Sequence, residues 1–174
     1  ANADRQGDRD ATERGRPEVM TDPYGPGVGS YNRMEVLLGN LHHMPIEDWL
    51  IQFGEAWSAC DNIGLYWADL NELIPGMSRQ QLDLLMTDQE REFHRQLPDR
   101  VQVWRGCYEF NADGLSWSLS REIAAGFTRL GRYHHPEHEP MLLSGWVNRD
   151  EIAVKLDRDE QEVIAWNVAD VTRI

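Results

Sequence analysis

The sequence predicts an α+β fold over residues 31–174, in which a helical part is followed by a set of short strands. Apolar residues recur every three or four positions over residues 31–97, which is the period of a helix packed on one face. Over residues 98–174 short runs alternate apolar and polar residues, which is the period of a strand. The length of 174 residues suits a single domain. Residues 1–30 mix charges with Gly and Pro, which predicts a flexible tail.

The chain is acidic, with 30 Asp and Glu residues against 17 Lys and Arg and a net charge of −13. This balance argues against a nucleic-acid partner, because binding a phosphate backbone needs a basic face. It favours a cationic partner, or serves only as a soluble surface. No apolar run approaches ~20 residues and no signal peptide is visible, so we expect a cytoplasmic protein that does not span a membrane. Cys60 and Cys107 form no metal-ligand pattern and require no disulfide, which fits a reducing compartment.

The first predicted helix carries an aromatic stripe. Pro45 suits a first helical turn, and apolar residues follow it at helical spacing: Ile46, Trp49, Leu50, Phe53 and Trp57. Stripes of this kind usually pack in a core, and we therefore interpret the helical part as scaffold.

Three further helix starts are predicted from capping residues. Asp61 is expected to cap a second helix, which would end at Pro75-Gly76. Ser78 and Thr87 are each followed three residues later by Gln or Glu, the capping-box pattern that begins a helix.

An arginine lies among the apolar residues of the first predicted strand. Between Val101 and Gly106, Arg105 shares a face with Val101 and Val103. A charge on a buried face is costly unless an anion pairs with it. The anion could be a structural carboxylate, which is the commoner case, or a ligand phosphate, which a guanidinium binds with two hydrogen bonds. Gly106 would let a ligand approach the backbone closely.

Two serines follow on the next predicted strand. Ser116 and Ser118 alternate with large apolar residues, which places both hydroxyls on one side of the strand. Ser120 is expected to cap a helix that extends to Leu130, with Phe127 among its apolar residues.

A loop over residues 131–140 is expected after that helix. It carries His134, His135 and His138, but no second element supplies ligands at metal-binding spacing, so a solvated loop is favoured over a metal site. Further strands are predicted over 141–147, 151–156, 161–168 and 171–174.

Two glutamates lie at the start of a strand near the C-terminus. Glu160 and Glu162 precede the strong strand formers Val163, Ile164 and Trp166. Because side chains alternate along a strand, both carboxylates are expected on one face, where each raises the cost of ionising the other. A solvated strand end would explain this segment taken alone, whereas the arginine and serines upstream favour a site.

The order Arg105, then Ser116-Trp117-Ser118, then Glu160-Gln161-Glu162 resembles the mono-ADP-ribosyltransferases with an arginine, Ser-x-Ser, Glu-x-Glu signature. The resemblance covers residues 97–174, and small uncharacterised proteins of bacteria and their phages are similar. It implies two small antiparallel sheets that form an NAD cleft, with the helices packed alongside. Trp117 departs from the family, where threonine is common.

The resemblance implies a role for each motif residue toward NAD. Glu162 would stabilise the oxocarbenium-like sugar cation that forms as nicotinamide leaves. Ser116 would hold that carboxylate in place. The remaining roles concern the two substrates: Arg105 would bind the cofactor phosphates, Gly106 and Ser118 would line the cofactor site, Phe127 or Tyr133 would stack on nicotinamide, and Glu160 would orient the acceptor.

The resemblance therefore implies transfer of ADP-ribose to a protein. It also implies arginine as the favoured acceptor, because a glutamate at the position of Glu160 goes with arginine acceptors in the family. Such a protein would be an effector or toxin-like modifier that could be delivered into a target cell. NAD hydrolysis, or transfer to a nucleic acid or small molecule, remains an alternative. A catalytically silent binding module of the same fold is a further one. No metal is expected, and the sequence does not indicate whether an inhibitory partner protein exists.

Overall fold

The computed structural model describes residues 24–157 and 160–174, so the predicted tail lies largely outside the described part. The first part of the chain is helical, as predicted. Its elements are α1 (Arg33–Asn40), α2 (Ile46–Trp57), η1 (Ile63–Tyr66), α3 (Trp67–Leu73), η2 (Ile74–Gly76), α4 (Arg79–Leu84) and α5 (Asp88–Gln96).

The second part combines strands with α6 and short 3-10 turns. The strands are β1 (Arg100–Cys107), β2 (Ser116–Ser118), β3 (Met141–Asn148), β4 (Ala153–Lys155), β5 (Glu162–Ile164) and β6 (Ala169–Arg173). Between them lie η3 (Glu109–Asn111), α6 (Arg121–Phe127), η4 (Gly131–Tyr133) and η5 (Arg149–Glu151). Mixed helix and antiparallel sheet confirms the predicted α+β class.

The prediction of two separate sheets is wrong, because all six strands of the described residues pair in one sheet with the order β4-β5-β2-β1-β3-β6. The sheet nevertheless has two halves. Within the first half β2 pairs with β5 and β5 with β4, and within the second half β1 pairs with β3 along its whole length. A single register pair, Trp104 with Ser118, joins the halves. That narrow junction is what the sequence patterns could not reveal.

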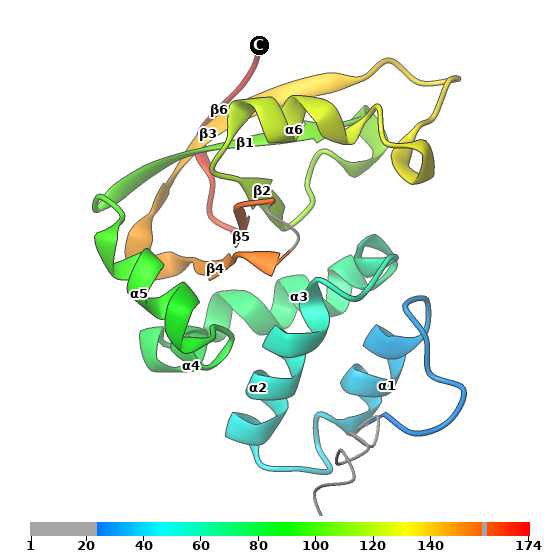
Figure 1. Cartoon of the computed structure of the whole chain (residues 1–174), viewed down its shortest axis with the longest axis vertical. Coiled ribbons are helices and arrows are strands. Elements are labelled where there is room, and N and C mark those ends of the chain that lie inside the picture. Colours follow the sequence, from blue (N-terminus) through cyan, green and yellow to red (C-terminus); the bar gives the residue numbers. More distant parts are fainter. Residues whose placement is uncertain (1–23, 158–159) are drawn as a thin grey trace, which may run out of the picture.

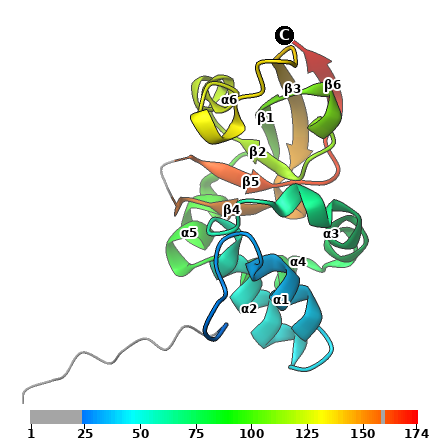
Figure 2. The same ribbon diagram turned by 90° about the vertical axis from the view of Figure 1, so that its right-hand side faces the viewer.

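The helices cover different parts of this sheet. α6 lies against β1 and β2, whereas α1 to α5 gather beyond the β4 edge, at the opposite end of the molecule (Figures 1 and 2). The aromatic stripe of α2 is confirmed as core, since Trp49, Leu50, Phe53 and Trp57 are all fully buried. The main core is continuous from these helices into the sheet, where it includes Val103 and Val163.

The capping predictions have mixed outcomes. Ser78 and Thr87 each form a complete capping box, and Ser120 accepts a hydrogen bond from the Ile123 N–H, so these three predictions are confirmed. The prediction that Asp61 caps a helix is wrong. The chain enters η1 with Asn62 at the N-cap and without a side-chain cap.

Candidate functional site

A pocket of about 220 Å³ lies between the helical part and the sheet. It brings together all of the residues predicted for the site, which are Arg105, Gly106, Ser116, Ser118, Phe127, Tyr133, Glu160 and Glu162. They come from β1, β2, the end of α6, η4, the segment just before β5 and the first residue of β5. Residues 24–97 close the other side, with Trp57, Asp61 and Trp67 among the lining residues.

Glu162 is the buried carboxylate of this pocket, with 7% of its surface exposed. Its Oε1 accepts hydrogen bonds from the Ser116 hydroxyl at 2.5 Å and from the Trp57 indole N–H at 2.8 Å. Burial raises the pKa of Glu162, and the negative charge of Glu160 acts in the same direction. The two hydrogen bonds and the charge of Arg105 only partly offset this rise in pKa. Among the described residues, no cation lies within ion-pair distance of Glu162 and no donor bonds to its Oε2.

Arg105 directs its guanidinium toward backbone rather than toward a carboxylate. It donates to the Ser116 carbonyl, and to the Asn111 carbonyl at 2.9 Å. Gly114 makes this possible, because a Cβ there would lie 2.0 Å from the Arg105 Nη2. Burial lowers the pKa of the Arg105 guanidinium, an effect that the charge of Glu162 opposes. No described carboxylate forms a salt bridge with Arg105, and its buried Nε has no described partner. The first of the two expectations, a structural carboxylate, is therefore not met within the described chain.

The two serines of β2 hold different groups. Ser116 bonds to the Glu162 side chain, as the resemblance implied. The Ser118 hydroxyl donates to the Glu160 carbonyl at 3.0 Å and accepts from the Ser120 N–H at 3.0 Å. Ser118 thus ties the residue before β5 to the start of α6.

Glu160 and Glu162 reach the same pocket through the backbone conformation of Gln161 and not through the alternation of side chains along a strand. β5 begins only at Glu162, and Gln161 has a positive φ of +46°. The prediction that both glutamates lie on one strand is therefore wrong. Both nevertheless line the same pocket, with Glu160 half-buried, because the turn at Gln161 redirects the chain.

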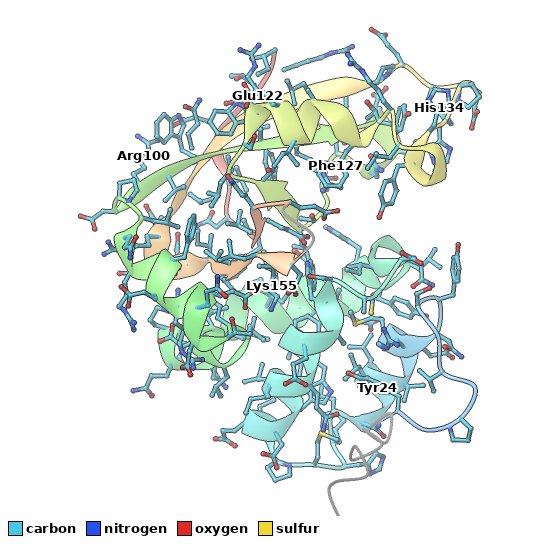
Figure 3. The ribbon with its side chains drawn as sticks, in the orientation of Figure 1. Tyr24, Arg100, Glu122, Phe127, His134 and Lys155 are labelled. Atoms are coloured by element: carbon cyan, nitrogen blue, oxygen red, sulfur yellow. The ribbon has the colours of Figure 1, made fainter. Side chains whose placement is uncertain are left out.

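Packing of α6 against β1 explains why a glycine is needed at position 106, which the sequence did not reveal. A Cβ at Gly106 would lie 1.9 Å from the Ala124 carbonyl oxygen, so a side chain there would push α6 away from β1. This close approach of α6 also brings Phe127 over the pocket, on the side of the helix that faces the helical part (Figure 3). Phe127 and Tyr133 form a tilted ring pair with centroids 6.0 Å apart.

Two of the three loop histidines, His135 and His138, pack on aromatic rings. His135 meets Tyr108 edge-on at 5.3 Å and Phe110 at 5.2 Å, and His138 lies 4.9 Å from Phe110. Within the described ranges, no group of three His, Cys, Asp or Glu side chains is arranged to hold a metal ion. The loop carrying His134 projects beyond α6 (Figure 3).

Sequence reasoning missed the contribution of the helical part to the pocket. Trp57 was expected only as core, and it is fully buried, yet its N–H reaches Glu162 across 105 positions of sequence. Trp67 likewise crosses to the second part, donating to the Asp113 carbonyl at 2.8 Å. No local signal distinguishes Trp57 from the other tryptophans of the helices, because its partner is set by tertiary packing. The interpretation of this part as scaffold alone is therefore too narrow.

A search of protein-family models, of curated proteins and of solved structures finds no match to this chain. The geometry of the pocket therefore carries the functional argument. In the described part of the chain, no helix has the length and apolar character needed to cross a membrane.

Proposed function

We propose that this protein is an NAD-dependent mono-ADP-ribosyltransferase that acts on a protein side chain, with arginine as the favoured acceptor. One observation carries the proposal: a buried carboxylate, Glu162, faces a pocket and forms no ion pair with any described residue. A buried carboxylate without an ion-pair partner costs folding free energy. Its presence in a pocket therefore favours a functional role for the charge. The same pocket contains a guanidinium without a described carboxylate partner, Arg105, and a serine that holds Glu162.

The reaction needs a negative charge in a fixed place. When the bond between the nicotinamide nitrogen and ribose C1′ breaks, its electron pair leaves with nicotinamide and positive charge develops on the sugar. A preorganised carboxylate stabilises that charge without having to reorient. Glu162 has this character, since Ser116 and Trp57 fix Oε1 and leave Oε2 without a described donor.

The size of the pocket supports binding of one end of NAD. Its volume of about 220 Å³ is below the roughly 300–1,000 Å³ of pockets that enclose a drug-sized ligand, so the nicotinamide and its ribose would be enclosed. Phe127 and Tyr133 offer ring surface for nicotinamide, whereas Arg105 offers a positive charge toward the phosphates.

The acceptor assignment rests on Glu160. Its half-buried side chain lines the pocket just before Glu162, where a carboxylate would attract a guanidinium and receive the proton lost when the guanidinium nitrogen bonds to C1′. The acidic chain, with a net charge of −13, also favours a cationic acceptor.

The test is incubation of the protein with NAD labelled in the ADP-ribose portion, together with a cell lysate or an arginine-rich protein. Label should appear on protein with the wild type and not with Glu162→Gln. Glu160→Gln should lose labelling of arginine while slow release of nicotinamide to water continues. Absence of both labelling and nicotinamide release in the wild type would refute the proposal. Nicotinamide release without any labelled protein would leave NAD hydrolysis as the function instead.

A further inference from the structure

The indole of Trp57 is in direct contact with the reactive carboxylate. Trp57 is the last residue of α2, is fully buried, and places its Nε1 2.8 Å from the Glu162 Oε1. An N–H that donates to an ionised carboxylate forms a charge-assisted bond, stronger than one between neutral groups. The bond is also directional, so it fixes the orientation of the carboxylate in addition to stabilising its negative charge.

We propose that Trp57 is a positioning residue of this site: α2 delivers its indole N–H to orient the Glu162 carboxylate and to stabilise its negative charge. The helical part would then contribute a hydrogen-bond donor to the site in addition to packing beside it. The catalytic consequence rests on the proposed function, whereas the effect on the carboxylate itself does not.

The same helix supplies a matched control. Trp49 is also fully buried on α2, and its indole N–H also donates, at 2.6 Å, to the backbone carbonyl of Leu37. Both indoles pack on Phe53, with centroids 5.0 Å away for Trp49 and 5.6 Å away for Trp57. The two tryptophans thus share helix, burial and aromatic neighbour, and differ in whether the acceptor is a neutral carbonyl or a carboxylate.

Other groups around the carboxylate set the background for this effect. Besides Trp57, the neighbours that bear on its charge are Ser116 on β2, Arg105 on β1 and Glu160 before β5. Lys155 is its register partner on β4. Lys155 directs its Nζ to Glu90 at 2.9 Å and so leaves Glu162 to its neutral donors. The titratable residues that line the rest of the pocket are Cys60, Asp61, Cys107, Tyr108, Tyr133 and His135. Trp57→Phe leaves each of these side chains in the sequence, so the variant and the wild type differ directly only in the indole N–H.

The experiment compares Trp57→Phe with Trp49→Phe. Each removes one buried N–H and keeps an aromatic ring, so losses from packing should be similar. Glutamate labelled with 13C at its carboxyl carbon allows Glu162 to be titrated by NMR, with Glu162→Gln identifying its signal. The midpoint for Glu162 should rise in Trp57→Phe and stay in place in Trp49→Phe. An unchanged midpoint in folded Trp57→Phe, or equal shifts in both variants, would overturn the proposal.

A second readout needs no substitution at Trp57. In the wild type, the 15N–1H signal of the Trp57 indole should move with pH at the Glu162 midpoint, and this movement should vanish in Glu162→Gln. An indole signal indifferent to the ionisation of Glu162 would also overturn the proposal, even if Trp57→Phe fails to fold.

Activity gives the third readout. Trp57→Phe should release nicotinamide about tenfold more slowly at neutral pH, and the acid limb of its pH profile should move upward with the NMR midpoint. An unshifted limb in an active Trp57→Phe enzyme would contradict positioning. If the midpoint shifts but the wild type never consumes NAD, the proposed function fails while the role of Trp57 toward the carboxylate stands.

Discussion

Two buried glutamates at the boundary between helices and sheet have opposite surroundings. Glu90 on α5 is 2% exposed and Glu162 on β5 is 7% exposed. Glu90 accepts from the ammonium of Lys155 at 2.9 Å and from the backbone N–H groups of Thr87 and Leu156. Among the described residues, Glu162 accepts side-chain hydrogen bonds only from the Trp57 indole N–H and the Ser116 hydroxyl.

The pKa values diverge accordingly. Burial alone would raise the pKa of Glu90, but the backbone hydrogen bonds and the charge of Lys155 outweigh it, and the pKa is lowered. Burial raises the pKa of Glu162, and its two neutral donors do not reverse that effect. A neutralised carboxylate holds α5 against β4, whereas an incompletely neutralised one faces a pocket. Burial by itself therefore does not identify a reactive carboxylate, because the partners decide its role.

The largest expected effect of a substitution on stability is that of Glu90→Gln. It leaves the Lys155 ammonium buried without its counter-charge, which typically costs about 3–5 kcal/mol of folding free energy. Denaturant unfolding would measure this loss. The exposed Glu92→Gln on the same helix is the control, and should leave the denaturation midpoint nearly unchanged. Equal effects of the two substitutions would remove the structural role assigned to Glu90.

The next effect concerns binding. Arg105→Ala should weaken NAD binding by about 2 kcal/mol, roughly thirtyfold, because the phosphates would lose a charged partner in a partly buried site. Arg100→Ala is the control on the same strand, since Arg100 is exposed and pairs with Asp170. Calorimetric titration of NAD into each folded variant would measure the change. An unaltered affinity in Arg105→Ala would make Arg105 a purely structural donor to the Ser116 and Asn111 carbonyls.

A smaller effect of opposite sign is expected for Glu162→Gln. The amide keeps an oxygen for Ser116 and Trp57 and removes a buried charge, so this variant should be about 1 kcal/mol more stable than the wild type at neutral pH. Thermal unfolding would show a melting temperature higher by about 2–4 °C. Destabilisation instead would mean that the charge of Glu162 contributes to the fold, as that of Glu90 does.

The pH dependence of stability should separate the two glutamates most finely. The raised pKa of Glu162 stabilises the folded state below the ordinary value of 4.5, and that contribution is lost as pH rises through the folded pKa. The lowered pKa of Glu90 stabilises the folded state above 4.5, and that contribution is lost as pH falls through the folded pKa. Unfolding free energies of Glu162→Gln and Glu90→Gln should therefore diverge from the wild type in opposite directions as pH rises. Parallel curves would contradict the comparison.

Local patterns predicted much of the chain. The alternation of Val101, Val103 and Arg105 correctly placed the arginine on the inner face of β1, and the capping boxes correctly placed the starts of α4 and α5. These features depend on neighbours within a few positions of sequence. The motif order also selected residues that the structure gathers in one pocket.

Features set by distant contacts were not predictable. The pairing of Trp104 with Ser118 decides that the strands form one sheet, and no pattern in either strand encodes that single junction. The approach of Ala124 to Gly106 and that of Trp57 to Glu162 likewise depend on how helices dock on the sheet. The sequence was sufficient to select Glu162 as a candidate site residue. Its indole donor, Trp57, could be identified only from the three-dimensional structure.

Nicotinamide release from NAD, followed by purified wild type and Glu162→Gln across the acid and neutral range, tests the central claim most directly. The account predicts that the wild-type rate falls at acid pH with a midpoint above 4.5, because Glu162 must be ionised and its pKa is raised. Glu162→Gln should be about a thousandfold slower than the wild type at neutral pH, should lack the acid limb, and should remain folded. A folded Glu162→Gln that releases nicotinamide as fast as the wild type would contradict the account.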